Sequence, residues 1–164
     1  PKGAGWVDYS NDGFEVAVKE NPNINVLAVK YGDTGKAVQK KLLKNTLNAD
    51  LQLDFIAGTA VTAEVAIAML RKRKLADKIK LVTQYFTPRV YTGIIRGKIS
   101  AAVSLSSVLQ GRIAMDQIVR ILEGKGYYKH VGVLLDVIHS GNIKTFDRSS
   151  TLAPNGFRTV YSVH

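Results

Sequence analysis

Residues 80–97 read KLVTQYFTPRVYTGIIRG and contain the signals of a strand, a turn and a helix, in that order. Residues 81–85, LVTQY, read as a buried strand. Thr87 is of the residue type that caps helices, and Pro88 suits a first helical position because the missing N–H is not needed there. Gly97 predicts the end of the helix. The stretch therefore predicts a strand-turn-helix unit, which is the repeating element of α/β sheets.

The alternation of strand and helix continues on both sides of this stretch. Further strands are expected at residues 24–29, 53–57, 99–103 and 133–138, and further helices at residues 6–19, 35–48 and 107–122. Thr62 is expected to cap one more helix, which closes with the basic run at residues 71–74. This order predicts an α/β fold, with a parallel sheet and helices on both of its faces.

Length and composition limit what the chain can be. Its 164 residues, 46% of them hydrophobic, can bury one real core. Cysteine is absent, which removes disulfide and thiolate chemistry, and no apolar run reaches the roughly 18 residues of a membrane span. The chain opens on Pro1, and its first helix has no strand before it. We therefore expect the later part of a longer α/β protein, with any targeting segment upstream.

No pattern of catalytic residues stands out. The run GDTGK at residues 32–36 is followed by Ala37, whereas a phosphate-binding P-loop needs Ser or Thr after its lysine. The glycines at positions 3 and 5 lack the third glycine of a dinucleotide site. The three histidines, His130, His139 and His164, have no metal-ligand spacing. The sequence thus predicts a protein that is not an enzyme and uses neither a cofactor nor a metal.

The residues expected at the carboxyl ends of the strands are aromatic and hydroxylic. Those that we regard as candidate ligand-binding residues are Trp6, Thr59, Tyr85, Phe86 and Ser104. Aromatic faces attract bulky alkylated ammonium groups, which lose their water cheaply, and hydroxyls with helix N-terminal amides can donate to a small anionic oxygen. For each aromatic side chain, packing in the core is the alternative.

The formal net charge is +10, and two basic clusters contribute to it. Residues 71–74 close a helix, where cations suit the helix dipole, and Lys40, Lys41 and Lys44 share a polar helix face. No recognition helix accompanies them, so the sequence favours solvated faces over nucleic-acid binding. A face of this charge can also speed the encounter with an acidic partner.

Four segments resemble the type I, ribose-binding-like family of periplasmic binding proteins. They are GTAVTAEVA at residues 58–66, YFTPRVYTGIIRGKI at 85–99, QGRIAMDQIVRILEG at 110–124 and LAPNGFRTVY at 152–161. The resemblance implies two α/β lobes that are joined by a hinge and close on a ligand. It implies that residues 1–106 form the second lobe without its first strand. Residues 107–130 would cross back toward the first lobe, and residues 131–164 would form a C-terminal strand and tail.

Within that family, the likeness is to periplasmic sensors of trimethylamine N-oxide. It implies binding of trimethylamine N-oxide or a similar small methylated amine. It also implies signalling to the periplasmic domain of a membrane sensor histidine kinase, in the two-component control of anaerobic respiration. Tyr85 matches a position of the family's aromatic box, and Trp6 lies in its glycine-rich turn. A periplasmic location without membrane insertion follows from the same resemblance.

Two other functions share this fold. One is a sugar- or small-molecule-binding component of a transporter, although sugar sites usually need several Asp, Asn and Arg side chains at strand ends, and Asp33 is the only acid that we expect there. The other is the effector-binding core of a LacI-type transcription regulator. It would carry a helix-turn-helix upstream instead of a signal peptide.

Overall fold

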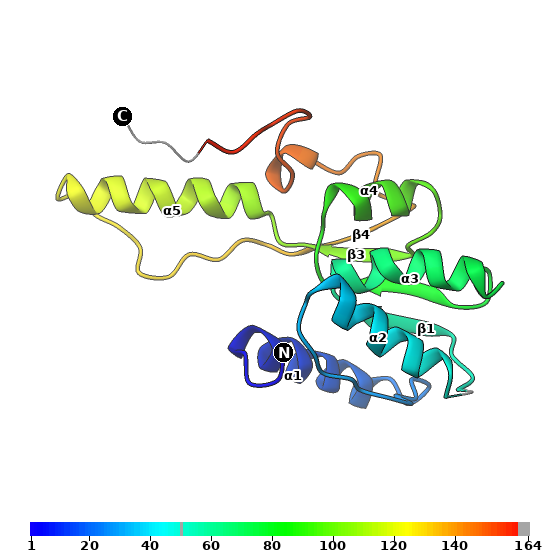
Figure 1. Ribbon diagram of the computed structural model, residues 1–164. Helices are drawn as coiled ribbons and strands as arrows, with labels where there is room; N and C mark the ends of the chain where they lie inside the picture. Colours follow the sequence, from blue (N-terminus) through cyan, green and yellow to red (C-terminus); the bar gives the residue numbers. More distant parts are fainter. Residues whose placement is uncertain (50, 161–164) are drawn as a thin grey trace. The chain divides into compact units, whose positions relative to one another are not determined.

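The computed structural model describes residues 1–49 and 51–160 (Figure 1). Its four strands belong to one open sheet in the order β1-β2-β3-β4, which confirms the expected α/β class. The chain divides into two compact units, Pro1–Val82 and Thr83–His164. Tyr161, at the end of the fourth family-like segment, and His164 lie outside the described residues.

Unit 1 contains three helices and the first strands of the sheet. Its elements are α1 (Gly5–Glu20), α2 (Lys36–Leu47), β1 (Phe55–Gly58), α3 (Ala60–Lys72) and β2 (Lys80–Thr83), whose last residue belongs to unit 2. The predicted helices are confirmed to within a few residues of their ends. β1, α3 and β2 form the β-α-β unit that the alternating pattern predicts.

α2 and α3 lie side by side and run in the same direction. Near their first turns, Thr62 Oγ1 donates a hydrogen bond of 2.8 Å to Gln39 Oε1. At their other ends, Arg73 Nη1 donates to the carbonyl oxygen of Leu47 at 2.9 Å, and Arg73 Nη2 donates to Asn48 Oδ1 at 2.6 Å. The C-terminal ends of the two helices therefore lie next to each other.

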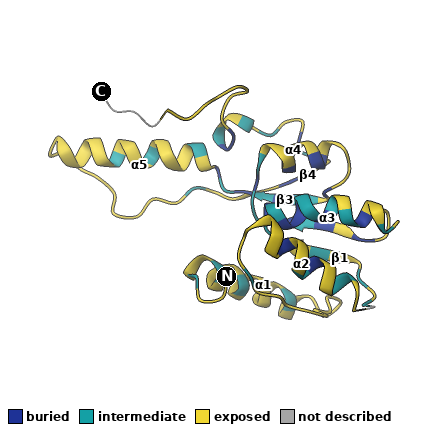
Figure 2. Cartoon of the chain, in the orientation of Figure 1, coloured by how far each residue is buried: buried dark blue, intermediate teal, exposed yellow. Residues whose placement is uncertain are grey.

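The prediction of a strand at residues 24–29 is wrong. In the described part of the chain these residues form no strand, and all of their side chains are exposed (Figure 2). A continuous apolar run becomes a buried strand only where neighbouring strands take its backbone hydrogen bonds and layers cover both of its faces. Neither is supplied to this run by the described residues.

The prediction of Thr62 as the helix cap is also wrong, because the helix begins about one turn earlier. Thr59 is the N-cap of α3, and Thr62 is the third helical residue. The two threonines form a capping box: Thr62 N–H donates to Thr59 Oγ1 at 3.3 Å, and Thr59 N–H donates to Thr62 Oγ1 at 3.2 Å. Both residues are good caps, so the sequence alone did not separate them.

Unit 2 holds the rest of the sheet. Its elements are α4 (Pro88–Ile95), β3 (Ala101–Ser104), α5 (Ser107–Leu122), β4 (Asp136–His139) and the 3-10 turn η1 (Arg148–Ser150). The predicted ends of α4 are confirmed. Val90 N–H donates to Thr87 Oγ1 at 3.1 Å, and Gly97 takes the left-handed conformation with φ +64°.

β4 runs antiparallel to β3, with Ala101 opposite His139 and Ser104 opposite Asp136. The sheet is therefore not parallel throughout, which corrects one detail of the expected fold. A parallel neighbour of β3 would need a crossover that carries the chain back to the end where β3 begins. After α5 the chain instead returns as an irregular segment to the end where β3 finishes, so β4 starts there and runs antiparallel.

Candidate ligand-binding site

Tyr85 lies two residues beyond the carboxyl end of β2 and has a half-buried side chain. Its backbone N–H donates to Thr83 Oγ1 at 3.3 Å, and Thr83 Oγ1 lies 3.4 Å from the Tyr85 carbonyl oxygen. Thr83 itself is buried. This local contact fixes the backbone of the turn after β2, so Tyr85 lies at the strand end, where the sequence predicts it.

Phe86 belongs to an aromatic cluster of unit 2. It is 9% exposed and makes edge-to-face contacts with Tyr91, at 6.2 Å between ring centroids, and with Phe146, at 5.1 Å. The guanidinium of Arg148 lies 5.1 Å from the centroid of the Tyr91 ring. Phe86 thus packs as a core residue and supports the turn that carries Tyr85.

The hydroxyl of Ser104 already has partners inside unit 2. Ser104 is fully buried, and its Oγ lies 2.6 Å from Thr151 Oγ1. The backbone N–H of Ser106 also donates to Ser104 Oγ, at 3.4 Å. These bonds join the end of β3 to the residue that follows η1. A ligand would have to exchange with Thr151 or Ser106 to reach Ser104.

The two other candidates, Trp6 and Thr59, lie in unit 1. Thr59 follows β1 directly, and its side chain is used in the capping box of α3. Trp6 lies in the first turn of α1, where its side chain is 39% exposed. The role of all five candidate residues in ligand binding stays a prediction.

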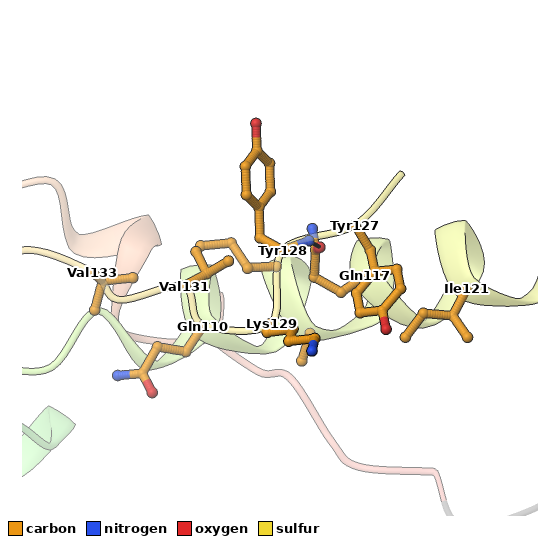
Figure 3. A pocket seen from close by; sticks show the side chains of 10 residues that line it. Gln110, Gln117, Ile121, Tyr127, Tyr128, Lys129, Val131 and Val133 are labelled. Atoms are coloured by element: carbon orange, nitrogen blue, oxygen red, sulfur yellow. Dashed lines mark hydrogen bonds between the residues drawn. The ribbon is translucent and has the colours of Figure 1, made fainter. Parts of the chain in front are cut away.

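Unit 2 also contains a hollow of about 410 Å³ that the sequence did not indicate (Figure 3). It lies between α5 and the extended segment that follows the helix. Its wall contains two tyrosines, Tyr127 and Tyr128, two glutamines, Gln110 and Gln117, and Lys129. Irregular segments carry no periodic pattern, so no sequence signal placed these side chains against the helix.

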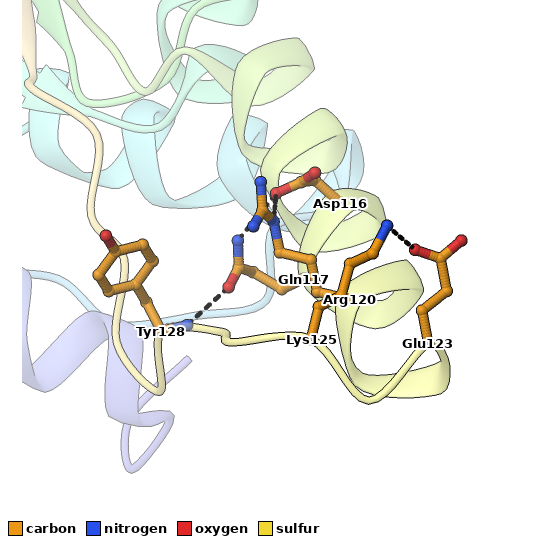
Figure 4. Close-up of polar contacts among 6 residues, drawn as sticks. All are labelled: Asp116, Gln117, Arg120, Glu123, Lys125 and Tyr128. Carbon is orange, nitrogen blue, oxygen red and sulfur yellow. Dashed lines mark hydrogen bonds and ion pairs between the residues drawn. The ribbon is translucent and has the colours of Figure 1, made fainter.

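Polar contacts occur within the last turns of α5 and between α5 and the segment that follows it (Figure 4). The N–H of Tyr128 donates to Gln117 Oε1 at 2.8 Å. Arg120 Nε donates to Asp116 Oδ2 at 2.8 Å, and this hydrogen bond raises the pKa of Arg120. The Asp116 and Arg120 side chains are exposed, and ion pairs of this kind contribute little stability. The hydrogen bond between Tyr128 and Gln117 links the extended segment to α5 across the hollow.

In residues 1–49 and 51–160, no group of three or more His, Asp or Glu side chains could hold a metal ion. No helix in that part of the chain has the length and apolar character needed to span a membrane.

A family model described as a periplasmic binding protein domain matches residues 6–126. The chain belongs to this family. The expected likeness to trimethylamine N-oxide sensors is confirmed as well: the periplasmic protein TorT of Escherichia coli K12 is 31% identical over 161 residues. That match covers 98% of the chain and 46% of TorT, so the chain spans about half the length of the curated relatives that it matches.

Solved structures agree with this assignment. A complex of the TorS sensor domain with TorT, in the presence of trimethylamine N-oxide, matches with a TM-score of 0.83 at 28% identity. The match covers 93% of the chain and 51% of that protein. A transporter solute-binding protein from Bradyrhizobium sp. BTAi1 with bound Bis-Tris matches with a TM-score of 0.88 at 52% identity, over 99% of the chain and 48% of that protein.

These relatives are binding or sensor proteins rather than enzymes. The family, together with TorT, points to the periplasm as the location, as expected from the sequence.

Proposed function

We propose that the chain is part of a periplasmic ligand-binding sensor protein for a small substituted amine, with trimethylamine N-oxide as the leading candidate. The observation that carries this proposal is the half-buried Tyr85 just beyond the carboxyl end of β2, where Thr83 fixes its backbone and the next residue, Phe86, is packed against Phe146. Two structures of relatives point to a nitrogen with three carbon substituents: the TorS sensor domain–TorT complex is in the presence of trimethylamine N-oxide, and the Bradyrhizobium protein has bound Bis-Tris.

The chemistry of such a ligand fits the candidate residues. An aromatic face attracts a positively charged, alkylated nitrogen, and this role falls to Tyr85, with Trp6 as a second aromatic side chain. The oxygen of an N-oxide needs hydrogen-bond donors, and Thr59 and Ser104 carry hydroxyls at strand ends. In the proposed protein, residues 1–106 contribute the second lobe, residues 107–130 cross toward the first lobe, and residues 131–164 complete the C-terminal part.

The proposed partner is the periplasmic domain of a sensor histidine kinase that resembles TorS. The TorS sensor domain–TorT complex supports this choice because the matching half of TorT has the same fold as this chain. A ligand alters signalling only if it binds the signalling conformation with a different affinity, so lobe closure on the amine is the proposed event that the kinase detects.

A transporter component is the second candidate. The Bradyrhizobium relative, at 52% identity, is described as a transporter solute-binding protein. The two functions differ in the partner rather than in the ligand. Capture of a kinase periplasmic domain by the ligand-loaded protein supports the sensor, and capture by a membrane permease instead would reject it.

The ligand class is tested by calorimetric titration of the protein in the form in which the cell makes it. The titrants are trimethylamine N-oxide, glycine betaine, Bis-Tris and ribose. Saturable binding of the N-oxide without binding of ribose is expected. Binding of ribose in preference to all the amines would contradict the proposal.

The role of Tyr85 is tested by substitution. Tyr85→Ala is expected to weaken binding of the N-oxide by about 1–2 kcal/mol, the scale of a desolvated cation–π contact. Tyr85→Phe keeps the ring and should retain most of the affinity. Tyr9→Ala is the matched control because Tyr9 lies on α1 with its side chain 82% exposed. Wild-type affinity in Tyr85→Ala would remove Tyr85 from the site.

A further inference from the structure

The positive charge of the chain is concentrated on one small part of unit 1. α2, together with α3 and the turn that follows it through Lys78, comprises 31 of the 164 residues. This part holds nine of the 23 Lys and Arg residues and only two of the 13 Asp and Glu residues. Its net charge is therefore +7, out of +10 for the whole chain.

The structure brings these charges together on α2 and on the neighbouring end of α3. Lys36, Lys40 and Lys44 recur every four residues and form one stripe on α2, while Gln39 and Leu43 are buried on another side of the helix. Because the C-terminal ends of α2 and α3 lie side by side, the stripe meets the cations that close α3. The exposed cations of this basic surface are Lys36, Lys40, Lys41, Lys44, Arg71, Lys72, Lys74 and Lys78.

The fold itself does not require so much charge. Cations in the last turn of a helix stabilise the helix dipole, which accounts for Lys44, Arg71 and Lys72. Lys36 opens α2, where the dipole disfavours a cation, and like charges four residues apart repel each other. Within the described residues, none of the seven lysines of the basic surface takes part in an ion pair. The repulsion within the basic surface therefore lowers the free energy of unfolding, and binding of an external anion would raise it.

We propose that the basic surface binds the anionic lipid headgroups of a membrane. Seven of its eight cations are lysines, and no aromatic residue lies in α2 or in residues 60–78. Protein–protein interfaces are depleted in lysine and enriched in aromatic residues and arginine, so an acidic protein partner fits this composition less well. Clusters of four to eight exposed cations bind anionic lipids electrostatically, without insertion. The protein would thereby be concentrated beside any membrane-bound partner.

The test is co-sedimentation with vesicles at about 0.05 M salt, for the protein in the form that the cell makes. Phosphatidylcholine vesicles with and without one third phosphatidylglycerol are compared. Wild type is expected to bind only the anionic vesicles and to be released at about 0.5 M salt, because salt screens exposed charges. The variant K40Q/K44Q/R71Q/K72Q is expected to lose about 100-fold or more in partitioning, since each cation near an anionic surface counts for about fivefold.

The matched control, K19Q/K98Q/K125Q/K144Q, removes four exposed lysines elsewhere and gives the same net charge. It is expected to lose less than about tenfold. Three results would overturn the proposal: no binding to anionic vesicles, an equal loss in both variants, or preferential binding of the wild type to polyglutamate. Titration with trimethylamine N-oxide is expected to be unchanged in both variants. Failure here is therefore distinguishable from failure of the proposed ligand.

Discussion

Two helices of unit 2 carry apolar side chains at helical spacing, and only one of the two helices has buried residues. α4 has eight residues, and three of them, Val90, Gly93 and Ile94, are buried. α5 has sixteen residues, all of them described, and none is buried (Figure 2). Helical periodicity shows that a helix has an apolar face. It does not show whether the same chain supplies what covers that face.

The different neighbours of the two helices explain the contrast. α4 packs against Ile99, which lies close beneath Gly93. α5 has its returning segment on one side, and large apolar side chains on the helix remain exposed, among them Met115, Ile118 and Ile121. This exposure supports the proposal that α5 is a crossing helix, which would pack against a further lobe.

The largest expected effect comes from truncating one isoleucine in each helix. Ile94→Ala removes a side chain that is 1% exposed and is expected to cost about 2–5 kcal/mol of unfolding free energy. Ile118→Ala removes one that is 49% exposed and should cost less than about 1 kcal/mol in this chain. Urea unfolding measures both. Equal losses would mean that another surface covers α5 in solution.

Replacing glycine by alanine is expected to destabilise the chain in α4 and to stabilise it in α5. A Cβ at position 93 would lie 2.7 Å from Ile99 Cδ1, so Gly93→Ala is expected to cost about 1–3 kcal/mol. A Cβ at position 111 of α5 meets nothing within 4 Å, and Gly111→Ala should stabilise the chain by about 0.5–1 kcal/mol. Thermal unfolding of both variants provides the measurement. A loss at position 111 would contradict the open environment of α5.

The starts of the two helices differ as well, and the expected effect there is the smallest. α4 has a side-chain cap at Thr87, whereas the N-cap of α5 is Ser106, which has φ +47° and makes no side-chain capping bond. Ser106→Gly relieves the left-handed backbone and should gain about 0.5–1 kcal/mol. Ser106→Ala keeps the strain and should gain nothing. If Ser106→Gly lowers the urea midpoint, the serine hydroxyl contributes more than the strain costs.

Much of the fold could be predicted from local signals. The helix predicted at residues 107–122 has the same bounds as α5, and Thr87, Pro88 and Gly97 delimit α4 as expected. Caps, breakers and periodicity act within a few residues, so a single sequence contains them. The family was also accessible, because four short segments carried its likeness.

The errors concern contacts with distant parts of the chain. The run at residues 24–29 has the composition of a strand, but the described residues offer it no neighbour. The direction of β4 depends on how the segment after α5 returns, which no periodic pattern encodes. In the candidate site, the position of Tyr85 was predictable from the strand end. The contact of Phe86 with Phe146 was not, because 60 residues separate them.

The central claim is that the apolar face of α4 is covered within this chain, whereas that of α5 is covered only by a partner surface. Amide hydrogen exchange of this chain, followed residue by residue, tests it. The account predicts slow exchange in α4, at the rate of global unfolding, and exchange in α5 that is faster by at least tenfold. Addition of the proposed first lobe should then slow exchange in α5 without changing exchange in α4. Equal protection of α4 and α5 in the isolated, monomeric chain would contradict the account.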